Sequence, residues 1–276
     1  MVNVKALTWP VGIIRITAVI LSCLAFSLVA SAGYVSSPYW AWCMFTWCFC
    51  FFFTFLILIL EFTTLNEKLP FCWDNFTATF VMLASMMCQA ACTIYPLFFA
   101  CNICYRQIAA SVMAALCAVT YYGEMRQKGF AEQNSSFFSK FPGKMKMVET
   151  FFPCLIFISL EKDQYFTSPG LQWCVAVYSL CFIFAVLIIL ITIADLTSIF
   201  PFCFDKLVLI YNVSALLLYM SAMVIWPLYT LHKGPINFIY PWLKLVVVTV
   251  MTVLNFIAYT LDTAYFIRRI FFVDNQ

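Results

Sequence analysis

Charged residues, glycine and histidine are scarce in this sequence, and each scarcity excludes a class of protein. Only 10% of the 276 residues are charged and 65% are hydrophobic, so the chain cannot present the polar surface of a water-soluble fold. The single histidine, His232, excludes a zinc site built on a pair of imidazoles. With seven glycines there is no glycine-rich phosphate loop, and Gly-x-Ser-x-Gly is absent. We therefore expect no enzyme, no cofactor, no metal site and no nucleic-acid partner.

The chain does contain several apolar runs of about twenty residues, the length that crosses a hydrocarbon core of roughly 30 Å. Runs without polar alternation favour helices, which satisfy their own backbone groups in lipid. We predict an all-α integral membrane protein with eight transmembrane helices. Seven of them are expected at about Ile13–Ala32, Cys43–Phe62, Phe76–Ala100, Gln107–Met125, Leu171–Ala194, Leu207–Tyr229 and Trp242–Phe266.

The remaining helix, fifth in the chain, is the shortest. It lies between Lys146 and Glu161, and both Glu149 and Pro153 interrupt its apolar sequence. Such a length also suits a re-entrant segment. A full span is favoured because the segment aligns with the first helix, and because lysines near its ends can extend to the interface.

The sequence repeats itself at an offset of 131 residues. Matched positions include Trp42 with Trp173, Pro70 with Pro201, Cys72 with Cys203, Asp74 with Asp205, and Arg15 with Lys146. Matches among apolar residues are common by chance, whereas a proline, a cysteine and an aspartate kept in one register are not. We predict two tandem four-helix units, at residues 7–130 and 142–270, joined by a basic linker at 131–141.

The distribution of basic residues predicts the orientation of the chain. Eight crossings put both termini and the linker on one side of the membrane, and most lysines and arginines then lie on that side. The positive-inside rule assigns this side to the cytosol. We therefore expect both termini to be cytosolic.

Charged residues at the cytosolic helix ends oppose the helix dipoles, which suggests that they neutralise one another. We predict ion pairs at this rim among Arg15, Glu61, Glu124, Lys146, Glu149, Asp195 and Asp262. The functional alternative is a proton or ion relay, since ionisable groups inside a membrane are often functional. The structural role is favoured because these groups lie at the boundary rather than at the midplane. Glu149, about one turn deeper, is the exception.

Most of the fourteen cysteines lie within apolar segments, where they act as small packing residues rather than as a disulfide scaffold. Cys72 and Cys203 lie beside the membrane in equivalent cytosolic loops, and they are either S-acylation sites or inert interfacial thiols. Cys101 and Cys104 lie at the outer end of the third helix and form either a local disulfide or two free thiols.

The region between the two units is basic. Arg126, Lys128, Lys140 and Lys144 lie on the predicted cytosolic face and would attract anionic lipid at about 1 kcal/mol per residue. The same charges would also determine the topology, and the two roles are compatible.

Four segments resemble the myeloid-associated differentiation marker family: Trp42–Cys50, Val148–Phe151, Trp173–Tyr178 and Trp226–Tyr229. Members of that family carry two MARVEL domains, the four-helix module of vesicle-trafficking and membrane-link proteins. The resemblance implies a non-enzymatic protein of plasma membrane and vesicles that organises cholesterol-rich ordered membrane and links it to trafficking or cortical actin. It implies no catalytic residues.

A duplicated membrane protein is also compatible with a transporter or channel. Transporter sites usually lie near the midplane at a repeat interface. Polar midplane residues are few here, with Gln89 the clearest and Asn255 less central, and neither recurs in the other unit. An organising role needs only a lipid-facing surface, cytosolic contacts and lateral association with other membrane proteins or a second copy of the chain. We favour it over transport.

Overall fold

A computed structural model describes residues 10–69, 72–99, 104–131, 141–160, 168–194, 204–231 and 239–273. The chain forms two compact units, Met1–Ser139 and Lys140–Gln276. The described part of the first unit contains α2 (Pro10–Ala32), α3 (Pro38–Phe62), the short 3-10 helix η1 (Leu65–Lys68), α4 (Trp73–Phe99) and α5 (Tyr105–Ala131). That of the second contains α6 (Phe141–Ser159), α8 (Pro169–Ile193), α9 (Phe204–Leu231), α10 (Ile239–Arg268) and the π-helical turn η4 (Arg269–Val273).

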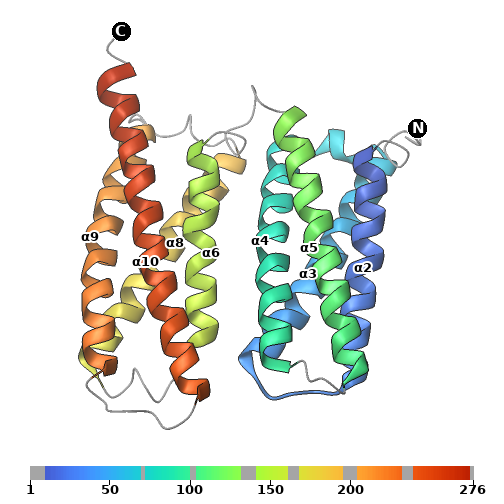
Figure 1. The fold of residues 1–276 in the computed structure, drawn as a ribbon. Coiled ribbons are helices and arrows are strands. Elements are labelled where there is room, and N and C mark those ends of the chain that lie inside the picture. Colours follow the sequence, from blue (N-terminus) through green and yellow to red (C-terminus); the bar gives the residue numbers. More distant parts are fainter. Residues whose placement is uncertain are drawn as a thin grey trace. The chain divides into compact units, whose positions relative to one another are not determined.

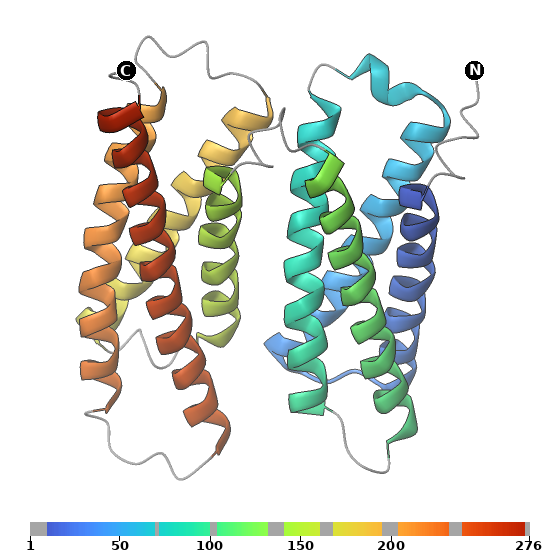
Figure 2. The same ribbon diagram turned by 45° about the horizontal axis from the view of Figure 1, so that its top comes forward.

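Each unit is a ring of four antiparallel helices (Figure 1). In the first unit α2 packs against α3 and α5, and α4 packs against the same two helices. The second unit repeats this order, with α6 and α9 each packed against α8 and α10. Figure 2 shows that α3 and α8 each cross their own bundle obliquely. The predicted all-helical membrane fold is confirmed.

Seven of the eight α-helices in the described residues are long and apolar enough to cross a membrane. The exception is α6, whose 19 residues include Lys144, Lys146 and Glu149. At about 1.5 Å per residue it is still about as long as the hydrocarbon core is thick. A complete crossing by α6 stays a prediction.

The internal repeat is visible in the way the helices begin and pack. Helices α3 and α8 both start with a proline that follows an extended serine, Ser37 or Ser168. The first helical position suits proline, because a backbone N–H there would have no partner within the helix. Equivalent thiols, Cys43 and Cys174, approach the carbonyl oxygens of Ala91 and Ala222 at 4.0 and 3.9 Å.

A buried aromatic pair also recurs, with its residues exchanged. The rings of Trp47 and Tyr95 lie 5.5 Å apart between α3 and α4, and those of Tyr178 and Trp226 lie 6.4 Å apart between α8 and α9. All four side chains are almost fully buried. At the offset of 131 residues, Trp47 is equivalent to Tyr178 and Tyr95 is equivalent to Trp226. Each unit therefore buries one tryptophan against one tyrosine, but the two residues have exchanged helices.

Candidate functional site

Arg15 of α2 is the centre of a polar cluster inside the first unit. Its Nη1 donates to Glu61 Oε2 of α3 at 2.5 Å, and its Nε donates to Glu124 Oε1 of α5 at 2.6 Å. The indole Nε1 of Trp73, the first residue of α4, donates to the other oxygen of Glu61 at 3.0 Å. These four residues, one from each helix, are called the first-unit cluster below.

The antiparallel ring explains why the first-unit cluster forms. The start of α2 and α4 lies beside the end of α3 and α5, so residues far apart in sequence meet at one end of the bundle (Figure 1). The side chains of Arg15 and Glu124 are 3% and 1% exposed, whereas that of Glu61 is 19% exposed. Glu61 therefore keeps contact with the surroundings of the bundle while the other two charges are enclosed.

Lys146 of α6 is the centre of the corresponding cluster in the second unit. Its Nζ lies 2.6 Å from Glu149 Oε2 and 2.8 Å from Asp262 Oδ2 of α10, and it also donates to Asn212 Oδ1 of α9. Asn212 Nδ2 in turn donates to Asp262 Oδ2 at 2.8 Å. These four residues, called the second-unit cluster below, are all 0% exposed.

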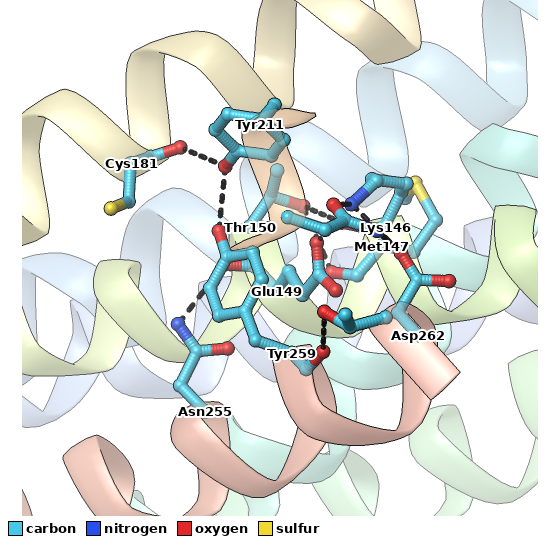
Figure 3. A network of polar contacts seen from close by, with 11 residues as sticks. Lys146, Met147, Glu149, Thr150, Cys181, Tyr211, Asn255, Tyr259 and Asp262 are labelled. Atoms are coloured by element: carbon cyan, nitrogen blue, oxygen red, sulfur yellow. Dashed lines mark hydrogen bonds and ion pairs between the residues drawn. The ribbon is translucent and has the colours of Figure 1, made fainter. Parts of the chain in front are cut away.

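Two tyrosines enclose the ammonium group of Lys146. Its Nζ lies 5.0 Å from the ring centroid of Tyr211 and 5.5 Å from that of Tyr259, within the range of a cation–π interaction. The two hydroxyls bond each other at 2.7 Å, and Tyr211 also donates to the backbone oxygen of Cys181 in α8. Figure 3 shows how these groups from all four helices surround the charges.

The clusters bring together most of the residues that the charge pattern predicted as ion pairs. Arg15 contacts Glu61 and Glu124, and Lys146 contacts Glu149 and Asp262. Asp195 lies outside the described residues. A further pair joins Arg269 Nη2 to Asp205 Oδ2 at 3.1 Å near the surface.

Sequence reasoning did not find the uncharged residues in and beside these clusters. Trp73, Asn212, Tyr211 and Tyr259 carry no charge, and their roles depend on which helix face turns inward. The repeat offered one signal, because Asn212 is a polar residue at the position where the first unit has Val81.

The predicted cysteine and lipid sites are only partly within the described residues. The thiol of Cys72 is free and exposed just before α4, and Cys104 is disulfide-bonded. Cys203 and Cys101 lie outside the described residues.

Of the predicted lipid-contact residues, Arg126 and Lys144 are exposed. The guanidinium of Arg126 lies 5.8 Å from the centroid of the Tyr122 ring. The structure does not describe the side chain of Lys128 or any part of Lys140.

Chemically, each cluster holds one cation between two carboxyl groups in a low-dielectric interior. Among the described residues, no group of three or more histidine, cysteine or acidic side chains is placed to hold a metal ion. Each cluster joins residues of different helices through ion pairs and hydrogen bonds.

Comparison with known proteins identifies relatives over almost the whole chain. A MARVEL family model, described as a membrane-associating domain, matches residues 6–125. The myeloid-associated differentiation marker homolog of Xenopus laevis is 35% identical over 98% of this chain and 95% of its own length.

Two human proteins match similarly. Myeloid-associated differentiation marker-like protein 2 is 37% identical over 99% of this chain and 95% of its own length. Myeloid-associated differentiation marker is 32% identical over 97% of this chain and 90% of its own length. No solved structure matches the chain.

Proposed function

Because this chain belongs to the myeloid-associated differentiation marker family and is a multi-pass membrane protein with a MARVEL domain, we propose that it organises cholesterol-rich ordered membrane and links it to trafficking or the cortical cytoskeleton. In this proposal it acts by lateral association and catalyses no reaction. Its partners are the bilayer, including cholesterol and anionic lipids, and other membrane proteins or a second copy of the chain.

The observation that carries the proposal is the separation of polar and apolar groups within each bundle. The charges of both clusters point inward and are paired. The outer faces of the helices are apolar, as on α8, where the exposed side chains include Leu180, Ile183, Phe184, Leu187 and Leu190. A surface of this kind interacts with lipid tails over the whole helix length.

The polar midplane residues also suit an organising role better than transport. Gln89 is exposed on α4, and its side-chain amide donates to Ser85 Oγ of the same helix at 3.4 Å. Asn255 of α10 is fully buried and donates to the backbone oxygen of Glu149 at 3.4 Å. One of the two residues is exposed and the other is buried, so they are not equivalent positions of a repeated site.

We further propose that both termini and the linker at 131–141 face the cytosol, with the protein in plasma membrane and vesicles. The exposed Arg126 and Lys144 flank this linker and are available to anionic lipid. Cysteine accessibility on intact cells, measured loop by loop, tests the orientation. Labelling of the linker from outside the cell would contradict it.

Partition between lipid phases tests the organising role. The full chain, fluorescently tagged and expressed in cells, is expected to concentrate in the ordered phase of plasma-membrane vesicles and to lose that preference when cholesterol is extracted. Replacing Cys72 and Cys203 by serine shows whether acylation contributes. Exclusion from the ordered phase would contradict the proposal. Solute or ion flux in liposomes, lost on changing Gln89 or Glu149, would favour transport instead.

A further inference from the structure

The two carboxyl groups of the second-unit cluster face a single cation in an interior without solvent contact. The ammonium of Lys146 has three N–H donors, and Glu149, Asp262 and Asn212 each accept one. Three acceptors around one nitrogen match the three N–H groups of an ammonium. With both acids ionised, the cluster would therefore carry a net charge of about minus one, by the ordinary charges of these groups.

Such an excess charge is unfavourable here. Lys146, Glu149 and Asp262 are each 0% exposed, so water does not stabilise an unbalanced anion. Buried ionisable groups in this position neutralise by holding a proton. The first-unit cluster has the same ratio of one cation to two acids, but Glu61 is 19% exposed and receives the indole N–H of Trp73.

The hydrogen bonds indicate which acid takes the proton. Asp262 Oδ2 accepts two hydrogen bonds, one from Lys146 and one from Asn212. Among the described residues, the side chain of Glu149 accepts from Lys146 alone, through Oε2. Glu149 Oε1 and Asp262 Oδ1 are buried and lack a hydrogen-bond partner among the described residues, and both carboxyl groups contact the same Nζ of Lys146 through their other oxygen.

We propose that the second-unit cluster is a proton-binding site, in which Glu149 holds one proton through Oε1 and shares it with Asp262. This proton neutralises the cluster and supplies the donor that the two free carboxyl oxygens need. The other titratable groups facing Glu149 are Lys146 on its own helix, Cys181 of α8, Tyr211 of α9 and Tyr259 of α10. The thiol and the two phenols are uncharged at neutral pH, so they do not balance the second acid.

The proposal has a definite consequence for stability. In the unfolded chain Glu149 meets water, where glutamate is ionised at neutral pH. Folding therefore takes up one proton, and the folded state loses stability as pH rises through neutrality. The expected contribution is about a tenfold change in the folding equilibrium per pH unit.

Infrared spectroscopy of the purified full chain in lipid nanodiscs tests the site. We expect a protonated-carboxyl band at neutral pH that Glu149→Gln abolishes. Asp262→Asn should abolish the band as well, because Lys146 is then balanced by an ionised Glu149. Glu124→Gln in the first unit is the matched control and should leave the band in place. Absence of the band in the unmodified protein, or its persistence in Asp262→Asn, would overturn the proposal.

Thermal unfolding supplies a second readout. Glu149→Gln mimics the protonated acid, so it should fold at neutral pH and should lack the alkaline loss of stability seen in the unmodified chain. If both chains lose stability in parallel as pH rises, the proposal is wrong. Failure of Glu149→Gln to fold at neutral pH would also count against it, because that result would require an ionised Glu149.

Discussion

Both units hold a basic residue of their first helix against two carboxyl groups, but the second carboxyl group comes from a different helix in each. In the first unit it is Glu61 at the end of α3, and the equivalent position of the second unit is Thr192. In the second unit it is Glu149 on α6, and the equivalent position of the first unit is Ala18. The ratio of acid to base is thus the same, while the acid has moved from the bundle edge to the enclosed interior.

This difference in position goes with a difference in the cation. Arg15 reaches two carboxylates through separate nitrogens, Nη1 and Nε, which suits acids on two neighbouring helices. Lys146 presents a single nitrogen, and its partners converge on that point. A compact charge can be enclosed completely, and the rings of Tyr211 and Tyr259 help to enclose the ammonium of Lys146. The comparison teaches that one helical scaffold supports either a solvent-linked or a sealed charge cluster.

Removal of the cation should give the largest loss of stability, and the loss should differ between the two units. Lys146→Met leaves two carboxyl groups in a site without solvent contact, and we expect a loss of about 3–5 kcal/mol in stability. Arg15→Met should cost less, because Glu61 is 19% exposed and keeps the hydrogen bond from Trp73. Thermal unfolding of both variants in the same detergent provides the measurement.

The cation experiment has an internal check. Lower pH should recover part of the stability of Lys146→Met, since protonated carboxyl groups no longer need a cation. Equal losses in Lys146→Met and Arg15→Met would show that enclosure does not distinguish the two clusters.

The fold itself was largely predictable, because apolar run length and the repeat are properties of the sequence alone. The first expected helix, Ile13–Ala32, corresponds to α2, which starts three residues earlier at Pro10. The acids that contact Arg15 were likewise among the residues predicted to pair, because charges at helix ends have few other ways to be stabilised.

The rest of the site depends on rotation of the helices, which charge patterns do not determine. Nothing in the sequence around Asn212 distinguishes an inward amide from one that faces lipid. Tyr211 and Tyr259 likewise look like other aromatic residues of apolar helices until the ring order places both beside Lys146. Complete enclosure of Glu149 follows from the same packing. The sequence marks Glu149 as the deepest of these charges, but it does not show how fully the helices surround it.

Replacement of Asn212, the uncharged partner of Lys146, should give an intermediate loss of stability. Asn212→Val introduces the side chain of the equivalent first-unit residue, Val81, and removes one acceptor from Lys146 and one donor from Asp262. We expect a loss of about 1–3 kcal/mol, the usual cost of leaving a buried polar group without its partner. The reverse exchange, Val81→Asn, should also destabilise the protein, because Val81 packs in an apolar cluster. If Asn212→Val unfolds at the same temperature as the unmodified chain, the amide is not part of the cluster's stability.

The smallest loss of stability should come from a glycine at which the two units differ in packing rather than in charge. Gly170 of α8 is equivalent to Tyr39 of α3, whose ring stacks on Phe98 at 4.3 Å. In the second unit the ring of Tyr229 lies against Gly170, and a Cβ added at Gly170 would lie 2.5 Å from that ring. Gly170→Ala should therefore cost about 1 kcal/mol, since the ring must move aside. Gly123→Ala on α5, where a Cβ meets no atom within 4 Å, is the control and should be neutral or slightly stabilising. In a Tyr229→Ala background the cost at Gly170 should disappear, and a cost that persists there would assign the effect to the helix backbone instead.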